Sequence, residues 1–215
     1  MVMKRMIAML LVCCVILSGF TALSAAPTEE QWKDLTDYRI MVGDPSGELR
    51  EQDGITRAEA VKMICASMGM TGAAQGLPTA FKDVPETHWA AGYIALAAQM
   101  GIVQGDENGL FAPNAQITNE EMLKMIVAAL GYAPMADMRG GYPAGYTMLG
   151  TSLGLTADMT LQTNVTALRS DAALMMVRAL DIPLMKQVGF GSTVEYAIMN
   201  GENGVELQTL RMLLQ

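Results

Sequence analysis

The sequence predicts a mostly α-helical protein of three tandem helical repeats, followed by a C-terminal β-hairpin. The first observation is an internal repeat: the run that starts at Ile55 recurs at Ile117, an offset of 62 residues (117 − 55 = 62). The second is a set of helix-start signals in front of apolar residues at helical spacing. Each unit of a repeat protein buries its apolar face mainly against its neighbours. The units are therefore expected to pack into one body.

The repeat extends beyond the two helix starts. The same offset relates four earlier or later positions to their counterparts: Ile40, Gly43, Asp44 and Gly69 to Ile102, Gly105, Asp106 and Gly131. A register kept over about 30 residues indicates duplication. A weaker third copy begins at Leu168, 50 residues after Thr118 (168 − 118 = 50). It lacks the threonine that starts the other two helices, and Ser170 is expected to cap it instead.

The N-terminus predicts a secretory signal peptide over residues 1–26. Lys4 and Arg5 precede a continuous apolar run, and small residues end the segment at Ser24-Ala25-Ala26. Pro27 hinders cleavage after Ala26, so a cut after Ser24 or Ala25 is an alternative. The other interpretation is a membrane anchor, but a span needs roughly 20 apolar residues and this run is shorter. We therefore expect no stable membrane span after cleavage.

Charge and cysteine content narrow the class of protein further. The chain of 215 residues has a formal net charge of −8, which argues against a nucleic-acid partner because nucleic acids attract basic surfaces. Two of the three cysteines leave with the signal peptide, and Cys65 alone forms no internal disulfide. Packing is therefore expected to hold the exported protein together.

Local signals place the elements in order. Helices are predicted over residues 28–38, 57–68 and 88–100, with another after Thr118. Thr28, Thr56 and Thr118 each stand three residues before a glutamine or glutamate, the spacing of a capping box. Residues 71–79 are predicted to form a linker. Two strands are predicted over residues 193–199 and 205–210, because an Asn-Gly pair at Asn200 lies between them.

The repeat resembles the S-layer homology family. The residues that carry the resemblance are Phe81-Lys82-Asp83-Val84, His88-Trp89-Ala90, Gly101-Ile102-Val103-Gln104-Gly105, Phe111, Pro113 and Ile117-Thr118, together with Ile55-Thr56-Arg57-Ala58-Glu59. The resemblance covers about residues 28–182. It implies module 1 over 27–69 (truncated), module 2 over 70–131 and a degenerate module 3 over 132–182. The β-hairpin tail then occupies 183–215.

The resemblance also implies a function. Such modules come in threes, form a mostly helical pseudo-threefold body, and bind anionic secondary cell-wall polysaccharide, often bearing pyruvate, in grooves between modules. The protein is then held on the outside of the wall, without catalysis and without a cofactor. The competing hypothesis is a surface-layer assembly module that contacts other surface proteins. A wall hydrolase is the third alternative. A lone histidine excludes most catalytic triads, and the sequence has no Cys/His metal cluster.

Six residues are candidates for ligand binding: Arg57, Asp83, Trp89, Gly105, Asn119 and Arg169. An arginine in the first turn of a helix can grip a carboxylate with two parallel hydrogen bonds, and the helix N-terminus favours negative charge. A tryptophan offers a flat face for a sugar ring. An aspartate can accept bonds from hydroxyl groups, and a glycine lets backbone approach a ligand.

Each candidate also has a plainer interpretation. Arg57 could be a solvated helix residue, Trp89 could belong to the core, and Asp83 could cap a turn. Asn119 replaces the expected arginine of unit two and carries no charge, so its groove is expected to be weak. Because no single unit holds the whole motif set, a groove between units that combines Arg57 with Trp89 is one possibility.

Overall fold

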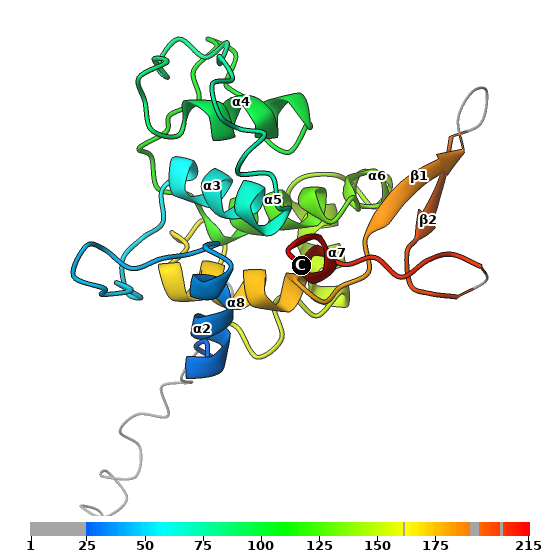
Figure 1. Cartoon of the computed structure of the whole chain (residues 1–215). Coiled ribbons are helices and arrows are strands. Elements are labelled where there is room, and N and C mark those ends of the chain that lie inside the picture. Colours follow the sequence, from blue (N-terminus) through cyan, green and yellow to red (C-terminus); the bar gives the residue numbers. More distant parts are fainter. Residues whose placement is uncertain (1–24, 161, 190–193, 203) are drawn as a thin grey trace, which may run out of the picture.

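The computed structural model describes residues 25–160, 162–189, 194–202 and 204–215, so the predicted signal peptide lies almost wholly outside the described residues. The described part is mostly helical, with one two-stranded antiparallel sheet (Figure 1). Its elements are α2 (Glu29–Asp37), α3 (Arg57–Ser67), α4 (Ala91–Gln99), α5 (Asn119–Ala129), α6 (Ala133–Met138), α7 (Ala144–Ser152), α8 (Arg169–Ala179), β1 (Met185–Gly189), β2 (Glu195–Ile198) and α9 (Leu210–Leu213).

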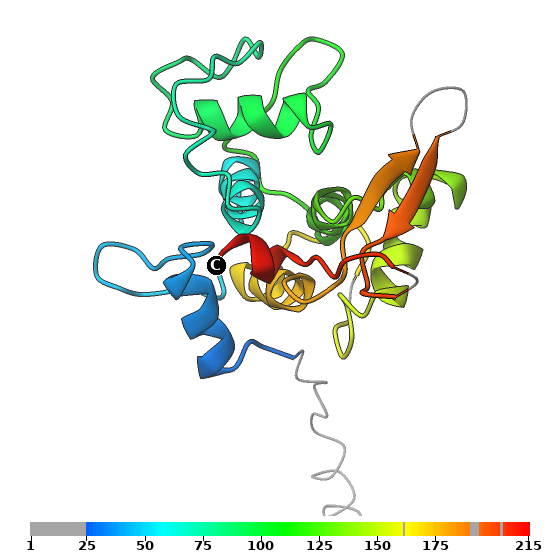
Figure 2. The same ribbon diagram turned by 45° about the vertical axis from the view of Figure 1, so that its right-hand side comes forward.

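Three helices of eleven residues each, α3, α5 and α8, form the centre of the molecule. Figure 2 shows them nearly end-on around a common middle. Eight residues of each are buried, on every side of the helix, which is the pattern of a helix enclosed by neighbours. A shorter helix covers each one: α4 packs on α3, α7 packs on α5, and α2 packs on α8.

A closed cycle of backbone hydrogen bonds joins the starts of the three central helices. The N–H of Ile55 donates to the carbonyl of Ala167 (3.0 Å), the N–H of Ala167 to Ile117 (2.9 Å), and the N–H of Ile117 back to Ile55 (3.1 Å). All three residues are fully buried. The cycle satisfies donors and acceptors that would otherwise be buried without partners. It also fixes the three helix N-termini relative to one another.

Capping explains where these helices begin. The three predicted capping boxes are confirmed: Thr28, Thr56 and Thr118 each accept from the backbone three residues on, and the side chain there accepts in return. The expected cap of α8 is wrong. Leu168 occupies the cap position without a side-chain bond, and Ser170 lies two residues inside the helix, where it is not at the N-cap.

The predicted helix over 88–100 is shorter in the structure. His88 and Trp89 belong to a turn, in which the His88 carbonyl accepts from Ala91 (2.9 Å) and His88 Nδ1 accepts from Ala90 (3.1 Å). The helix α4 therefore begins at Ala91. The short helix α6, which carries a proline in its first turn, was not predicted.

The C-terminal hairpin exists, and the strand predicted over 193–199 contains β2, but its predicted partner over 205–210 is wrong. The structure pairs β1 with β2 in antiparallel register, Met185 opposite Ile198, so the hairpin lies earlier in the chain than predicted. Residues 205–208 form no strand, and Asn200-Gly201 turns the chain out of β2 instead of joining two strands. Asn-Gly marks a turn but does not say which strand pairs with β2. The β1–β2 pairing continues in the bond from the Met199 N–H to the Leu184 carbonyl (2.8 Å).

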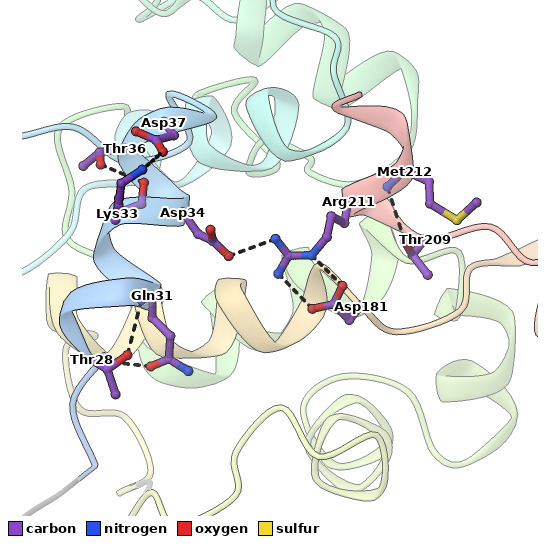
Figure 3. A network of polar contacts seen from close by, with 10 residues as sticks. All are labelled: Thr28, Gln31, Lys33, Asp34, Thr36, Asp37, Asp181, Thr209, Arg211 and Met212. Atoms are coloured by element: carbon purple, nitrogen blue, oxygen red, sulfur yellow. Dashed lines mark hydrogen bonds and ion pairs between the residues drawn. The ribbon is translucent and has the colours of Figure 1, made fainter.

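A salt-bridge cluster ties the last helix to the first described one (Figure 3). Arg211 of α9 donates from Nε and Nη2 to the two carboxylate oxygens of Asp181 (2.6 and 2.8 Å), and from Nη1 to Asp34 of α2 (2.8 Å). The fork of donors on a guanidinium suits this two-carboxylate arrangement. Arg211 therefore clasps α2, the end of α8 and α9 together.

Two further findings concern the free cysteine and the length of the helices. Cys65 is buried, and burial raises the pKa of its thiol to about 12, so the thiol stays protonated and unreactive. No helix in the part of the chain that the structure describes has the length and apolar character that crossing a membrane requires.

Candidate functional site

Two grooves lie beside the first turns of α8 and α3, at Arg169 and Arg57. The first, here called the Arg169 groove, has a volume of about 270 Å³. Its wall comes from the segment after α2, from α3, from the turn before α4 and from the start of α8. It is lined by Ile40, Met41, Val42, Gly43, Asp44, Arg50, Glu59, Lys62, Met63, Trp89 and Arg169.

The second, here called the Arg57 groove, has a volume of about 570 Å³. Its lining repeats that of the first at the offset of 62 residues for most positions, for example Lys62 and Lys124. The lining residues are Arg57, Asp83, Ile102, Val103, Gln104, Gly105, Asp106, Leu110, Phe111, Ala112, Ala115, Gln116, Glu121, Lys124, Met125 and Tyr142.

The two arginines make matching contacts. Arg169 donates from Nε to the Leu49 carbonyl (2.9 Å) and from Nη2 to the Val42 carbonyl (3.1 Å). Arg57 donates from the same atoms to the carbonyls of Phe111 (2.9 Å) and Gln104 (3.2 Å). Both side chains are largely buried, 12% and 18% exposed, so the interpretation of Arg57 as a solvated helix residue is wrong.

The carbonyl bonds leave part of each guanidinium available. A guanidinium has five N–H donors, and those on Nη1 face only a glutamate at a longer distance. That contact is 3.6 Å from Arg169 to Glu59 Oε1 and 3.7 Å from Arg57 to Glu121 Oε1, beyond a good hydrogen bond. The same two glutamates close the capping boxes of α3 and α5, which confirms their predicted capping role. Each arginine is therefore held in place with donors to spare.

A lysine reinforces the positive charge of each groove. Burial lowers the pKa of Lys62, and the nearby charges of Arg169 and Arg39 lower it further. Burial likewise lowers the pKa of Lys124, with Arg57 adding to the effect. A cation whose pKa is lowered by a second cation lies where an anion would be favourable. The sequence analysis missed both lysines, although the repeat aligns them at the offset of 62 (124 − 62 = 62).

An exposed aromatic ring borders each groove. Trp89 is 58% exposed, so the interpretation that places it in the core is wrong, whereas Trp32 is only 7% exposed and belongs to the core. Trp89 lines the Arg169 groove. Tyr142, which is 49% exposed, lines the Arg57 groove. The structure thus places Trp89 with Arg169 and not with Arg57.

Asp83 and Gly105 lie in the Arg57 groove and have contacts within the protein. Asp83 Oδ1 accepts from the Phe111 N–H (2.8 Å) and Oδ2 from the Ala112 N–H (2.7 Å). Burial raises the pKa of this carboxyl, but the two bonds outweigh it and the net pKa is lowered. A Cβ on Gly105 would lie 2.6 Å from the Phe81 ring and 2.8 Å from the Leu110 carbonyl oxygen. Both residues therefore shape the loop that receives Arg57.

Asn119 occupies the position in α5 that Arg57 and Arg169 occupy in α3 and α8. It is 4% exposed, and its Oδ1 atom is buried without a hydrogen-bond partner. It lines neither of the two grooves. The structure therefore brings five of the six candidates to two grooves: Arg169 and Trp89 in one, and Arg57, Asp83 and Gly105 in the other.

The described residues hold no cluster of three or more histidine, cysteine, aspartate or glutamate side chains that could bind a metal ion. His88 lies in the turn before α4, with its ring stacked on Trp89 at 5.8 Å between ring centroids.

Comparison with known proteins identifies the family. The model of the S-layer homology domain matches residues 80–123, the segment that carries Asp83, Trp89 and the loop around Arg57. The chain contains an S-layer homology domain. The match covers part of the chain. That the helical segments before and after it are modules of the same family is a proposal, which is argued under the proposed function.

The relatives of this S-layer homology protein are surface proteins for the most part. A cell surface protein of Thermoanaerobacter kivui is 35% identical over 150 residues, which cover 68% of this chain and 19% of that protein. A middle cell wall protein of Brevibacillus brevis is 31% identical over 175 residues (80% and 16%). An endoglucanase of a Bacillus species is 31% identical over 148 residues (60% and 15%). The chain spans less than a fifth of the length of these relatives. Because it contains an S-layer homology domain and resembles cell-surface proteins, it is itself a cell-surface protein.

Proposed function

We propose that this chain anchors a protein non-covalently to the cell wall by binding an anionic, pyruvate-bearing wall polysaccharide in two grooves. The observation that carries the proposal is the matched pair of grooves, each with a fixed arginine, a lysine of lowered pKa and an exposed aromatic ring. A pyruvate ketal presents a carboxylate beside a sugar ring. The cations suit the carboxylate, and the aromatic ring suits the sugar.

The proposal includes three helical units of the S-layer homology type, arranged around a pseudo-threefold axis. It is supported by the cycle of hydrogen bonds among Ile55, Ile117 and Ala167, and by the way each central helix is covered by a helix of another unit. Grooves then fall between units, so that Arg169 of the third unit meets the loop of the first, and Arg57 of the first meets the loop of the second.

Two grooves rather than three are proposed to bind. At the third position Asn119 supplies no charge, and the residue that corresponds to Lys62 and Lys124 is Leu174 (124 + 50 = 174). A site without either cation has no charge interaction that offsets the free-energy cost of desolvating a carboxylate. Two binding sites on one body still raise the apparent affinity for a polymer above that of either site alone.

The first experiment is co-sedimentation of the exported chain, from residue 27, with purified wall sacculi before and after chemical removal of the secondary polymer. We expect pelleting with intact walls and loss of pelleting after the polymer is stripped. Pelleting that survives stripping would contradict the polysaccharide as the ligand.

Arginine variants then test the grooves. Arg169→Gln and Arg57→Gln should each weaken binding of soluble polymer fragments by about tenfold or more, because a charge-assisted pair is lost. The matched control is Arg178→Gln on α8, since Arg178 also bonds a neighbouring loop carbonyl, Leu155 (3.2 Å), but lines neither groove. Calorimetry measures affinity, and circular dichroism checks the fold. Equal weakening in the control would contradict the site assignment.

A second function, assembly with other surface proteins, is favoured by one observation. The hairpin exposes a set of apolar side chains that the helical body does not cover: Val188, Val194, Tyr196 and Ile198. If the chain fails to bind intact walls, these residues are the place to test, by substitution to serine and measurement of self-association in the ultracentrifuge. The name endoglucanase describes the Bacillus relative alone, and we propose no catalytic role for the present chain.

A further inference from the structure

A further space, here called the Glu120 cavity, lies where α7 and residues 162–163 meet the first turn of α5. It has a volume of about 570 Å³, within the usual range of small-molecule sites. The cavity is lined by Glu120, Pro143, Ala144, Thr147, Met148, Thr151, Gln162 and Thr163. It shares no residue with the Arg169 groove or the Arg57 groove. Because neither Asn119 nor any residue of α8 lines it, the Glu120 cavity is not a third copy of those grooves.

The carboxylate of Glu120 is buried with one oxygen unpaired. Glu120 is only 9% exposed, although it belongs to the first turn of α5. Its Oε1 accepts from the backbone N–H of Asn164 (2.9 Å), whereas Oε2 is buried without a hydrogen-bond partner among the described residues. Asp83 shows the saturated arrangement, since both of its oxygens accept from N–H groups of a loop. Glu120 therefore keeps one acceptor beyond the one that holds the loop.

No positive side chain compensates this oxygen. Glu120 makes no salt bridge with any residue that the structure describes, and no lysine or arginine is among the residues described as lining the cavity. Lys124, one turn further along α5, lines the Arg57 groove instead. A buried acceptor without a partner costs free energy that an incoming donor would offset, and a charged donor offsets most. The positive end of the α5 dipole favours the ionised carboxylate, so the expected donor is a cation.

The rest of the cavity wall selects among cations. Pro143, Ala144 and Met148 are apolar and suit a flexible alkyl chain. The lining residues that the structure describes include no aromatic ring, in contrast to Trp89 and Tyr142 at the two grooves, so a sugar ring has no flat face to lie on. A guanidinium suits two parallel carboxylate oxygens, but only one is unpaired here. An ammonium group is a point charge and needs only one.

Hydroxyl groups supply further acceptors for an ammonium, which has three N–H donors. Thr147 donates its hydroxyl to the Pro143 carbonyl (3.0 Å), and Thr151 shares a hydrogen bond with the hydroxyl of Thr156 (3.0 Å). A hydroxyl oxygen has two lone pairs, so both threonines of the cavity can still accept a hydrogen bond. These bonds also hold the two side chains in place, which lowers the entropy cost of binding.

We propose that the Glu120 cavity binds a lysine side chain of another surface protein, with the alkyl stem along α7 and the ammonium group at Glu120. The terminal torsion of a glutamate is broad, so a small rotation turns Oε2 toward the occupant. The overall charge agrees with a basic partner, because the formal net charge of −8 attracts positively charged segments. The inference goes beyond the proposed function and does not rest on it.

The test titrates the chain from residue 27 with short blocked peptides and follows the backbone amide signals of Thr147, Thr151 and Thr163 by nuclear magnetic resonance. The peptides consist of alanine with a central lysine, norleucine or arginine. Norleucine keeps an unbranched alkyl chain and lacks the charge. Glucosamine is the fourth probe, because it carries an amino group on a sugar ring. We expect the lysine peptide to bind about tenfold more tightly than each of the other three probes.

Variants of the cavity locate the binding. Glu120→Gln keeps an acceptor for the Asn164 N–H but removes the charge, so the lysine peptide should lose about tenfold in affinity. Ala144→Phe, at an exposed position of α7, fills the cavity and should abolish binding. The matched control is Glu30→Gln, which removes the same charge from the second residue of α2, where the side chain is exposed. This control should bind the lysine peptide as the unchanged chain does.

Each outcome supports or overturns one step. Circular dichroism checks the fold, and Ala144→Phe is the deciding variant if Glu120→Gln does not fold. Unmoved amide signals at about 20 mM lysine peptide would overturn the site. Equal affinity for the norleucine peptide, or full affinity in Glu120→Gln, would overturn the role of the carboxylate. Equal affinity for the arginine peptide would overturn the preference for an ammonium group. Tighter binding of glucosamine would assign the cavity to an amino sugar and overturn the protein partner.

Discussion

At the scale of single residues, each groove places an arginine near a lysine. Its carboxylates accept hydrogen bonds from backbone N–H groups: Asp44 and Glu59 in the Arg169 groove, and Asp83, Asp106 and Glu121 in the Arg57 groove. Lys62 donates to the backbone carbonyls of Arg39 and Ile40 rather than to a carboxylate. Lys124 sits in the same relation to Arg57 as Lys62 does to Arg169. The free protein therefore holds a charge arrangement that a bound anion would relieve, and this predicts how binding depends on pH.

We predict that affinity for the anionic polymer falls as the pH rises toward the ordinary lysine pKa. In the free protein the pKa values of Lys62 and Lys124 are lowered from 10.5, so both charges are lost earlier than those of exposed lysines. A bound carboxylate stabilises the ammonium and raises the pKa again, so binding takes up protons in this window. Calorimetry between about pH 7 and about pH 10, in buffers of different ionisation enthalpy, measures the uptake.

The control for this experiment is the double variant Lys62→Arg/Lys124→Arg. A guanidinium stays charged throughout the range, so the alkaline loss of affinity should disappear. An alkaline loss of the same size in the double variant would assign the effect to other groups.

At the scale of elements, the starts of the helices depend on short local signals. We predict that Thr56→Ala lowers the free energy of unfolding by about 1 kcal/mol, because the α3 cap is lost. Thr56 Oγ1 accepts from the Glu59 N–H (3.3 Å), and the Thr56 N–H donates in return to the Glu59 carboxylate (2.9 Å). Urea denaturation followed by circular dichroism measures the change. Thr56→Ser keeps the hydroxyl and should retain most of the stability; an equal loss there would argue against the cap.

The elements that the sequence predicted well are those with local causes. Thr28, Thr56 and Thr118 start helices because their own side chains satisfy nearby N–H groups, whatever lies elsewhere in the fold. The strand pairing failed because β2 pairs with the strand just before it, β1, whereas the Asn-Gly signal pointed to the segment after it. Cap position likewise explains the failure at Ser170: its residue type suits a cap, but the backbone places it inside α8.

The candidate site could likewise be predicted only in part. Residue types and the repeat offset identified Arg57, Arg169 and Trp89 as groove residues. They could not show which arginine meets which ring, because that pairing depends on how the three central helices are joined in space. Asp83 is the opposite case. The motif predicted that its carboxylate binds the ligand, but both carboxylate oxygens accept hydrogen bonds from N–H groups of a loop in its own unit.

At the scale of the whole molecule, each unit is completed by the others. We predict that residues 70–131, the segment that includes the family match, do not fold cooperatively when expressed alone. Ile117, Met122 and Ile126 are fully buried in the whole chain and would face water in the fragment. The fragment should show weak helicity and no cooperative thermal transition, whereas the chain from residue 27 should unfold in a single step. A cooperative transition in the fragment would show that the unit is autonomous.

The Arg211 clasp also ties folding to the order in which the chain is delivered. Asp34 lies near the beginning of the described chain and Arg211 near its end, and the salt bridge between them needs both. A polypeptide that crosses a membrane N-terminus first presents Asp34 long before Arg211 emerges. Until then α2 and the end of α8 lack the cation that joins them. In a chain exported N-terminus first, the salt bridge between Asp34 and Arg211 can therefore form only after Arg211 has emerged on the far side of the membrane.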